Sequence, residues 1–195
     1  MKRFVVVIDT QSDFMHQKGA LSVAGGEALI PAAEDFLRRL RPGETEGVLF
    51  TFDTHEPDIF AASEEGKEFP LHCVRGSAGW ENVLAPSLVD PAIPVWRLEK
   101  GVFDMWKEPD VVLLSEPDPA APPRPRDAFF DDLMARGVRD VTVIGVAADY
   151  CVKWAAEGLV ARGFSVSVPR ALTAGIHRDI DEVAAEEFEG RLTVA

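Results

Sequence analysis

Three polar residues follow apolar runs typical of buried strands, and their types together suit nucleophilic catalysis. Asp9 follows FVVVI, Lys100 ends IPVWRLEK, and Cys151 lies two residues after an aspartate in GVAADYCV. A thiol at the start of a helix and beside an ammonium group ionises more readily, and a nearby carboxylate can carry its proton during turnover. The three residues together therefore predict a cysteine nucleophile.

Each of these residues also has a simpler structural interpretation. A carboxylate such as Asp9 at a strand end often caps a turn, and a lysine such as Lys100 usually extends to water. A lone cysteine is most often a small buried hydrophobic residue. The catalytic interpretation therefore depends on all three side chains lying together in the fold.

A second group of polar residues has the types that bind a divalent metal ion. Asp53 and His55 alternate in FDTHEPD, and His72 lies in FPLHCVRGSAGW. Carboxylate and imidazole ligands suit first-row metals such as zinc, iron or manganese. Glu64 and Glu65 lie between these segments, and either of them could complete the ligand set.

The composition predicts one domain that binds a small molecule. The chain has 195 residues, 47% of them hydrophobic, so it can bury one core without disulfides. Its 33 acidic and 20 basic residues give a formal charge of -13, which disfavours nucleic acid and anionic membranes as partners. The apolar part of the opening MKRFVVVIDT is too short for a signal peptide or a membrane span, so we expect a cytoplasmic protein with free thiols. The composition is compatible with either a monomer or a homo-oligomer.

Apolar runs alternate with helical patterns along the chain. Strands are predicted at 4–8, 47–52, 93–100, 141–147, 164–168 and 192–194. Helices are predicted around 30–40, 127–136, 151–163 and 179–189. This alternation predicts an α/β fold with a parallel sheet covered on both faces. Ligands bind beyond the carboxyl ends of such strands, where the polar residues at the strand ends should converge.

The segment EPDPAAPPRPRD at 116–127 contains five prolines and is predicted to be an irregular loop. Neither side of it has the patterning of an independent core. We therefore predict a loop insertion in a single domain that spans residues 1–195.

Motifs along nearly the whole chain resemble those of the isochorismatase-like cysteine hydrolases, and among them the nicotinamidases and pyrazinamidases. The matching motifs are IDTQSDF at 8–14, GALSVAGGE at 19–27, FDTHEPD at 52–58, FPLHCVRGSAGW at 69–80, KG at 100–101, GVAADYCV at 145–152 and LTAG at 172–175. The resemblance implies a three-layer α/β/α fold with a six-stranded parallel sheet and a triad of Asp9, Lys100 and Cys151. It also implies a cis peptide bond between Val146 and Ala147. The N–H groups of Ala147 and Cys151 would then form an oxyanion hole.

The resemblance also implies how metal and substrate are held. The implied ligands of one divalent metal ion, zinc before iron or manganese, are Asp53, His55, Glu65 and His72. Some nicotinamidases have a glutamate seven residues before the last histidine, which favours Glu65 over Glu64. Phe14 and Phe69 match the aromatic residues that clamp the pyridine ring, whose nitrogen the metal would bind.

The implied reaction is the deamidation of nicotinamide, or of analogues such as pyrazinamide, to a carboxylate and ammonia through a thioester, as in the salvage of pyridine nucleotides. Asp9 would take the thiol proton and Lys100 would keep the thiolate available. The stretch VFDMWKEPDVV after Lys100 departs from the family, as does Ala148 in place of the usual threonine. Two alternatives are therefore a related amidase for another amide or carbamoyl compound, and an inactive relative with a binding or scaffold role.

Overall fold

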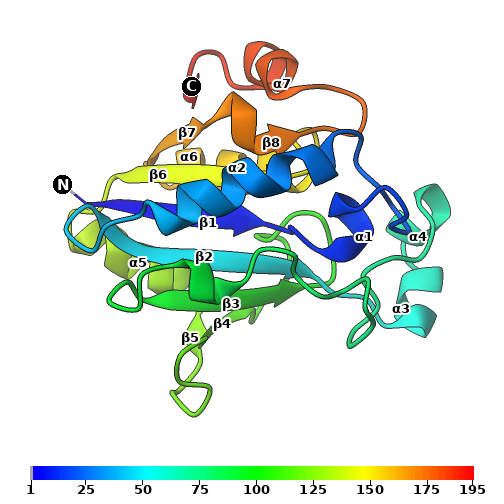
Figure 1. The fold of residues 1–195 in the computed structure, drawn as a ribbon, viewed down its shortest axis with the longest axis horizontal. Coiled ribbons are helices and arrows are strands. Elements are labelled where there is room, and N and C mark those ends of the chain that lie inside the picture. The colour runs from blue at the N-terminus through cyan, green and yellow to red at the C-terminus, as the bar shows by residue number, and fades with distance from the viewer. Residues whose placement is uncertain (1) are drawn as a thin grey trace.

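The computed structural model describes residues 2–195, which form a mixed sheet with helices on both faces (Figure 1). The strands are β1 (Arg3–Ile8), β2 (Thr45–Asp53), β3 (Val95–Lys100), β4 (Val112–Ser115), β5 (Arg124–Pro125), β6 (Asp140–Val146), β7 (Ser165–Val168), β8 (Thr173–Ala174) and β9 (Leu192–Val194). The helices are α1 (Ser12–Met15), α2 (Gly26–Arg38), α3 (Pro57–Ala61), α4 (Glu65–Glu68), α5 (Arg126–Ala135), α6 (Cys151–Ala161) and α7 (Ile180–Glu187), with 3₁₀ turns at Pro86–Leu88 and Arg170–Leu172.

The spatial order of the strands is β5-β4-β3-β2-β1-β6-β7-β9, and β8 pairs with β6. The neighbours from β3 to β9 are all parallel, which confirms the six-stranded parallel sheet that the family resemblance implies. The sheet is larger than predicted, because β4 and β5 extend it with antiparallel pairing beside β3 and β8 adds a short parallel piece. These additional strands have two to four residues, too few for a periodic pattern.

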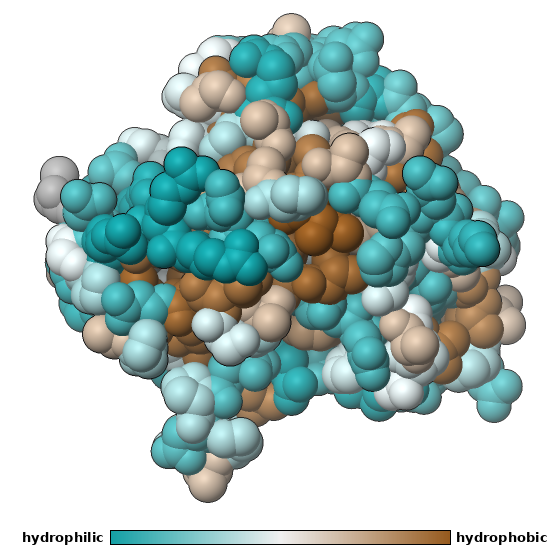
Figure 2. All heavy atoms as spheres, viewed as in Figure 1, coloured by the Kyte–Doolittle hydropathy of each residue, from teal (hydrophilic) through white to brown (hydrophobic). Residues whose placement is uncertain are grey.

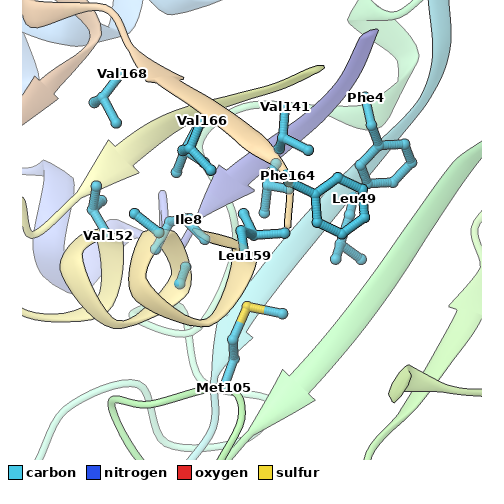
Figure 3. Packing of buried hydrophobic residues seen from close by; sticks show 14 of the residues in the cluster. Phe4, Ile8, Leu49, Met105, Val141, Val152, Leu159, Phe164, Val166 and Val168 are labelled. Carbon is cyan, nitrogen blue, oxygen red and sulfur yellow. The ribbon is translucent and has the colours of Figure 1, made fainter. Parts of the chain in front are cut away.

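Strand β1 shows why both faces of the sheet are covered. Phe4, Val6 and Ile8 belong to one buried hydrophobic cluster, whereas Val5 and Val7 belong to a second. Successive side chains of a strand point to opposite faces, so an unbroken apolar run requires packing on each side. Helix α2 packs on one face, and α5 and α6 pack on the other (Figure 1), where the larger cluster of Figure 3 lies.

The proline-rich segment lies mainly between β4 and β5, in the hairpin that projects from the lower edge of Figure 1. Residues 116–123 contain neither helix nor strand, as predicted. Helix α5 then begins at Arg126, one residue before the predicted start.

The stretch after Lys100 that departs from the family packs against the body of the fold. Met105 is buried, and the Trp106 indole N–H donates to the Ala155 carbonyl oxygen of α6 at 3.3 Å. The Glu108 carboxylate accepts a hydrogen bond from the Gly101 N–H at 2.7 Å. This stretch therefore forms an ordered wall directly beyond the end of β3.

The face seen in Figure 2 is mainly hydrophilic, with smaller groups of hydrophobic side chains between the polar ones. Among residues 2–195, no helix is both long enough and apolar enough to span a membrane.

Candidate active site

The strand order brings the predicted polar residues together at one edge of the sheet. Strands β3, β2, β1 and β6 are consecutive neighbours, and all four run in the same direction. Lys100 ends β3 in register with Asp53, which ends β2, and Asp9 follows β1. Cys151 is the first residue of α6, just after β6. The sequence prediction that these side chains converge beyond the strand ends is therefore met.

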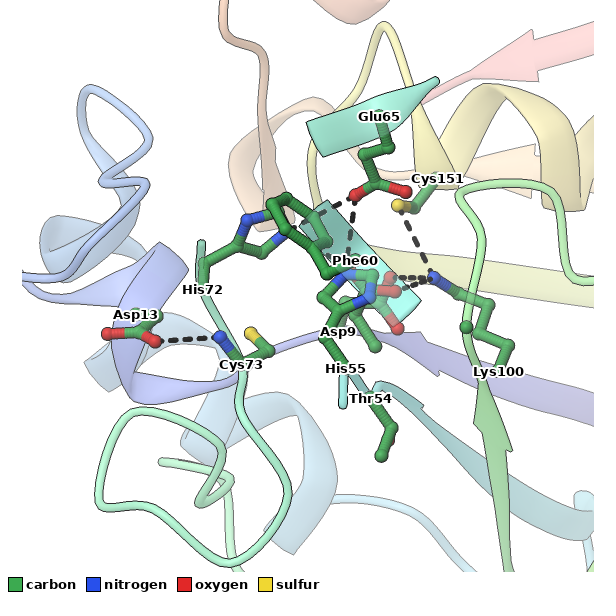
Figure 4. Close-up of polar contacts among 12 residues, drawn as sticks. Asp9, Asp13, Thr54, His55, Phe60, Glu65, His72, Cys73, Lys100 and Cys151 are labelled. Carbon is green, nitrogen blue, oxygen red and sulfur yellow. Dashed lines mark hydrogen bonds and ion pairs between the residues drawn. The ribbon is translucent and has the colours of Figure 1, made fainter. Parts of the chain in front are cut away.

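Lys100 lies at the centre of the predicted triad (Figure 4). Its side chain is buried, and the residue is only 3% exposed. Its Nζ atom lies 2.8 Å from Asp9 Oδ2 and 3.6 Å from Cys151 Sγ. The same ammonium also lies 3.2 Å from Asp53 Oδ1. The Thr51 hydroxyl donates to Asp9 Oδ1 at 2.6 Å, which fixes the orientation of that carboxylate.

The charges of this cluster stabilise one another despite burial. Burial lowers the pKa of Lys100, but Asp53 and Asp9 outweigh that effect and raise it well above the usual value. Burial raises the pKa of Asp53, but Lys100 and the neighbouring histidines lower it well below the usual value. An ammonium and a carboxylate are thus both kept charged in a buried site.

The resting state of Cys151 differs from the thiolate that its place in the sequence predicts. Burial raises the pKa of the Cys151 thiol well above its usual value, Lys100 acts in the opposite direction, and Asp9 and Asp53 raise it further. The expectation of a lowered thiol pKa is therefore wrong for this structure, because the helix and the ammonium do not compensate for lost hydration and two carboxylates. The thiol must lose its proton during attack, and Asp9 shares the Lys100 ammonium with Cys151, which makes it the candidate acceptor.

Four buried side chains from three segments form the predicted metal cluster, namely Asp53, His55, Glu65 and His72. One ligand atom from each lies within 4.8 Å of all the others. The segments meet because the His55 N–H donates to the Cys73 carbonyl oxygen at 3.1 Å, and the Arg75 N–H donates to the His55 carbonyl oxygen at 3.1 Å. Glu64 instead points to solvent and pairs with Lys67 at 2.5 Å, so the fold brings only Glu65 into the cluster.

The geometry of this cluster fits a divalent cation. Asp53 Oδ2 lies 3.1 Å from the Nε2 atoms of both His55 and His72, and Glu65 Oε1 lies 3.3 Å from the same two nitrogens. Tetrahedral ligands about 2.1 Å from a metal are about 3.4 Å apart, close to these separations. The buried Glu65 Oε1 atom also lacks a hydrogen-bond partner among residues 2–195, as expected for an atom that has a metal as its partner.

The two carboxylates of this cluster also set the charge of its histidines. Burial lowers the pKa of His55 and of His72, but the adjacent carboxylates of Asp53 and Glu65 outweigh it and raise both values to about 9. Two protonated imidazoles between two carboxylates carry the charge that a divalent ion would carry.

Two residues that the sequence interpretation did not single out hold the metal cluster in place. Gln11 brackets the backbone of Asp53, because its side-chain oxygen accepts the Asp53 N–H and its side-chain nitrogen donates to the Asp53 carbonyl oxygen, both at 2.8 Å. The Phe60 ring lies edge-on to His55 at 4.6 Å and to His72 at 5.4 Å. The motif IDTQSDF contains Gln11, but nothing in the sequence indicates which backbone it would bind.

The two phenylalanines predicted to clamp a ring lie in different surroundings. Phe14 is buried, and its ring centre is 5.2 Å from that of His72. Phe69 packs edge-on against Phe103 and Tyr150, each at 5.5 Å. Phe103 belongs to the stretch that departs from the family, so that stretch supplies an aromatic side chain beside Tyr150, the residue before Cys151. A hollow of about 450 Å³ adjoins this group and is lined by residues that include Phe103 and Glu65.

The turn before the nucleophile has the predicted backbone. The peptide bond between Val146 and Ala147 is cis. The Ala147 carbonyl oxygen accepts the N–H groups of Tyr150 and Val152, both at 3.1 Å. Cys151 begins a helix, so its N–H has no carbonyl from a preceding helical turn and can donate to a ligand.

The second cysteine lies apart from the metal cluster. Cys73 is fully buried with Phe14, Met15 and Val146, and its N–H donates to Asp13 at 2.8 Å. Burial and three nearby carboxylates raise the pKa of its thiol far above the usual value. Cys73 is therefore a core residue.

Comparison with known proteins gives the context for this geometry. No protein-family model matches the chain. A nicotinamidase/pyrazinamidase of Mycobacterium tuberculosis is 32% identical over 189 residues, which make up 95% of this chain and 94% of that protein.

Two solved structures superpose on the whole chain. One is the pyrazinamidase of Pyrococcus horikoshii in complex with zinc, with a TM-score of 0.74 and 24% identity, covering 100% of this chain and 99% of the other. Another is PnC1 from L. infantum in complex with nicotinate, with a TM-score of 0.74 and 25% identity, covering 100% of this chain and 92% of the other.

Proposed function

Since the chain belongs to the nicotinamidase/pyrazinamidase family of amidohydrolases, we propose that it hydrolyses nicotinamide, and its analogue pyrazinamide, to the carboxylate and ammonia through a thioester on Cys151. The observation that carries the proposal is the position of Lys100 Nζ, 2.8 Å from Asp9 and 3.6 Å from the Cys151 sulfur. The buried free thiols of Cys73 and Cys151 support the cytoplasmic location predicted from the sequence.

The first step moves one proton within the buried cluster. Asp9 takes the thiol proton as the Cys151 sulfur attacks the carboxamide carbon, so a carbon–sulfur bond forms and the carbonyl electrons move to oxygen. The transfer exchanges a carboxylate charge for a charge on sulfur and then on oxygen, and the total charge of the cluster does not change. Lys100 adjoins both the donor and the acceptor, so it stabilises the negative charge before and after transfer.

The remaining steps return the proton and release the product. The N–H groups of Ala147 and Cys151 would bind the tetrahedral oxygen. Asp9 then gives its proton to the amide nitrogen as the carbon–nitrogen bond breaks, which releases ammonia and leaves the thioester. Asp9 next takes a proton from water as the water oxygen attacks, the carbon–sulfur bond breaks, and the sulfur recovers the proton.

Two further groups of residues would hold the substrate. Asp53, His55, Glu65 and His72 would bind one divalent metal ion. That ion would supply a Lewis acid for the pyridine nitrogen or for water. Phe14 and Phe69 would contact the faces of the ring, which places the carboxamide beside Cys151.

The test is ammonia release from nicotinamide, pyrazinamide, benzamide and an N-carbamoyl amino acid, measured with wild type and Cys151→Ala. Nicotinamide and pyrazinamide should be hydrolysed fastest, because benzamide lacks the ring nitrogen and the carbamoyl compound lacks the ring. Cys151→Ala should be inactive with unchanged thermal stability. Full activity in Cys151→Ala would refute the mechanism, and turnover of only the carbamoyl compound would assign a different amidase activity.

A further inference from the structure

One buried carboxylate next to the nucleophile has no part in the chemistry described above. Asp149 lies two residues before Cys151 and is only 5% exposed. Its carboxylate accepts hydrogen bonds from three consecutive backbone N–H groups, those of Ile176 at 2.9 Å, His177 at 2.7 Å and Arg178 at 3.0 Å. Hydrogen bonds from N–H groups to a charged carboxylate are stronger than bonds between neutral groups, so these three bonds hold the two segments together firmly.

Arg178 does not pair its side chain with Asp149. The Arg178 guanidinium binds Glu186 at 2.8 Å and Glu187 at 2.6 Å, both on α7. Lys153 of α6 also binds Glu187, at 2.9 Å. The segment that Asp149 holds is thus anchored on its other side to α7 and, through Glu187, to the helix that begins with the nucleophile.

The segment 173–178 runs beside the nucleophile turn over the length of that turn. Strand β8 pairs with the end of β6, and the Thr173 hydroxyl donates to the Gly145 carbonyl oxygen at 2.7 Å. The Ala148 N–H donates to the Ala174 carbonyl oxygen at 2.8 Å. The bonds to Asp149 continue this series where backbone pairing has ended. Among residues 2–195, they are the last hydrogen bonds between the two segments before Cys151.

We infer that Asp149 is a positioning residue, whose bonds to the N–H groups of residues 176–178 hold the turn 147–151 in the shape that presents the Cys151 sulfur and the N–H groups of Ala147 and Cys151 to the substrate. This inference rests on the proposed function, because those groups act in the reaction proposed above. Misplacing reacting groups by about 1 Å can cost about 100-fold in rate, so the shape of this turn bears directly on turnover.

The test compares Asp149→Asn with Asp179→Asn as a matched control. Asp179 also accepts a backbone N–H, that of Glu182 at 2.9 Å, but it caps α7 and does not bond to the nucleophile turn. An asparagine at 149 keeps the shape of the side chain but loses the charge and one acceptor oxygen. We expect kcat for nicotinamide to fall roughly 10- to 100-fold in Asp149→Asn with KM within about threefold, and to change less than about threefold in Asp179→Asn.

Hydrogen exchange of backbone amides provides a readout that does not need substrate. In Asp149→Asn, exchange should accelerate in residues 145–152 and 174–178 but not in β1 and β2. In wild type, the amides of residues 176–178 should exchange at least about tenfold slower than in an unfolded chain. The wild-type measurement tests the inference even if the variant does not fold.

Several outcomes would overturn the inference. In the kinetic assay, these are an unchanged kcat in Asp149→Asn, or a rise in KM that accounts for the whole decrease in kcat/KM. In the exchange experiment, they are faster exchange throughout the chain of Asp149→Asn, or wild-type amides at 176–178 that exchange as fast as in an unfolded chain. A wild-type protein that hydrolyses no amide would instead refute the proposed function. The exchange data would then still decide whether Asp149 holds the turn.

Discussion

Replacing Lys100 with methionine should slow alkylation of Cys151 by at least about sevenfold at neutral pH, because the substitution removes the cation nearest the sulfur. The ammonium lies 3.6 Å from Sγ in wild type. At that distance, Coulomb's law gives about 5 kcal/mol at an effective dielectric constant of 20 and about 1.2 kcal/mol in water. The smaller energy corresponds to nearly one pKa unit and therefore to about sevenfold less thiolate.

The assay is the rate of modification by iodoacetamide against pH, with each cysteine followed by peptide mass spectrometry. In wild type, Cys151 should react faster than Cys73, because the Lys100 ammonium lies 3.6 Å from the Cys151 sulfur, whereas Cys73 is fully buried and has no hydrogen-bonded cation at its sulfur among residues 2–195. Lys153→Met is the matched control, since Lys153 is also a buried lysine but pairs with Glu187. This control should leave the rate at Cys151 unchanged.

Loss of Lys100 also leaves two buried carboxylates without their cation, which is expected to cost about 3–5 kcal/mol of stability. If Lys100→Met does not fold, Asp9→Asn and the double variant Asp9→Asn/Lys100→Met allow the same comparison with one carboxylate neutralised. A Cys73 that reacts as fast as Cys151, or a Cys151 rate that does not change when Lys100 is lost, would refute the pairing of ammonium and sulfur.

Three further predictions concern the metal cluster and its supports. Elemental analysis should find about one divalent metal per chain, and Glu65→Gln should lower metal affinity at least about tenfold whereas Glu64→Gln should not; equal effects would contradict the ligand assignment. In chelator-treated protein, the pKa values of His55 and His72 are raised from 6.5 to about 9. Protonation of the two histidines therefore stabilises the folded state fully below pH 6.5, and this stabilisation is lost as the pH rises through 9. Urea denaturation should show that the free energy of unfolding falls by roughly 3 kcal/mol per histidine between about pH 6 and pH 10. An unchanged free energy of unfolding would contradict the ion pairs between the protonated histidines and the carboxylates of Asp53 and Glu65. Gln11→Met removes two buried hydrogen bonds to the Asp53 backbone and a partly buried one to the Trp80 carbonyl oxygen, and it should lower the free energy of unfolding by about 3 kcal/mol in the same assay. A decrease of less than about 1 kcal/mol would contradict the stabilising role of Gln11 at the end of β2.

The main strands and helices could be predicted because their patterns are strong and local. The run from Phe4 to Ile8 has no polar residue, and the structure buries both of its faces. The short helices α1, α3 and α4 were not predicted. Each has only four or five residues and depends on neighbouring segments for stability.

The candidate site was partly predictable for a related reason. Asp9, Asp53 and Lys100 each lie where an apolar run ends, and parallel strands place such ends at one edge of the sheet. The choice of Glu65 over Glu64 came from the family resemblance, because both are charged residues in one loop. The role inferred for Asp149 had no sequence signal, since it depends on three N–H groups 27 to 29 residues away.

The sequence by itself determined which residue types lie at the strand ends and which runs must be buried, because side-chain chemistry and periodicity are local properties. The tertiary structure decided which of those ends are neighbours, and it placed Lys100 between Asp9 and Cys151. It also decided that the resting thiol holds its proton, although the sequence suggested a thiolate. The physical reason is that a pKa depends on the loss of hydration and on every charge nearby, and both are set only when distant segments pack together.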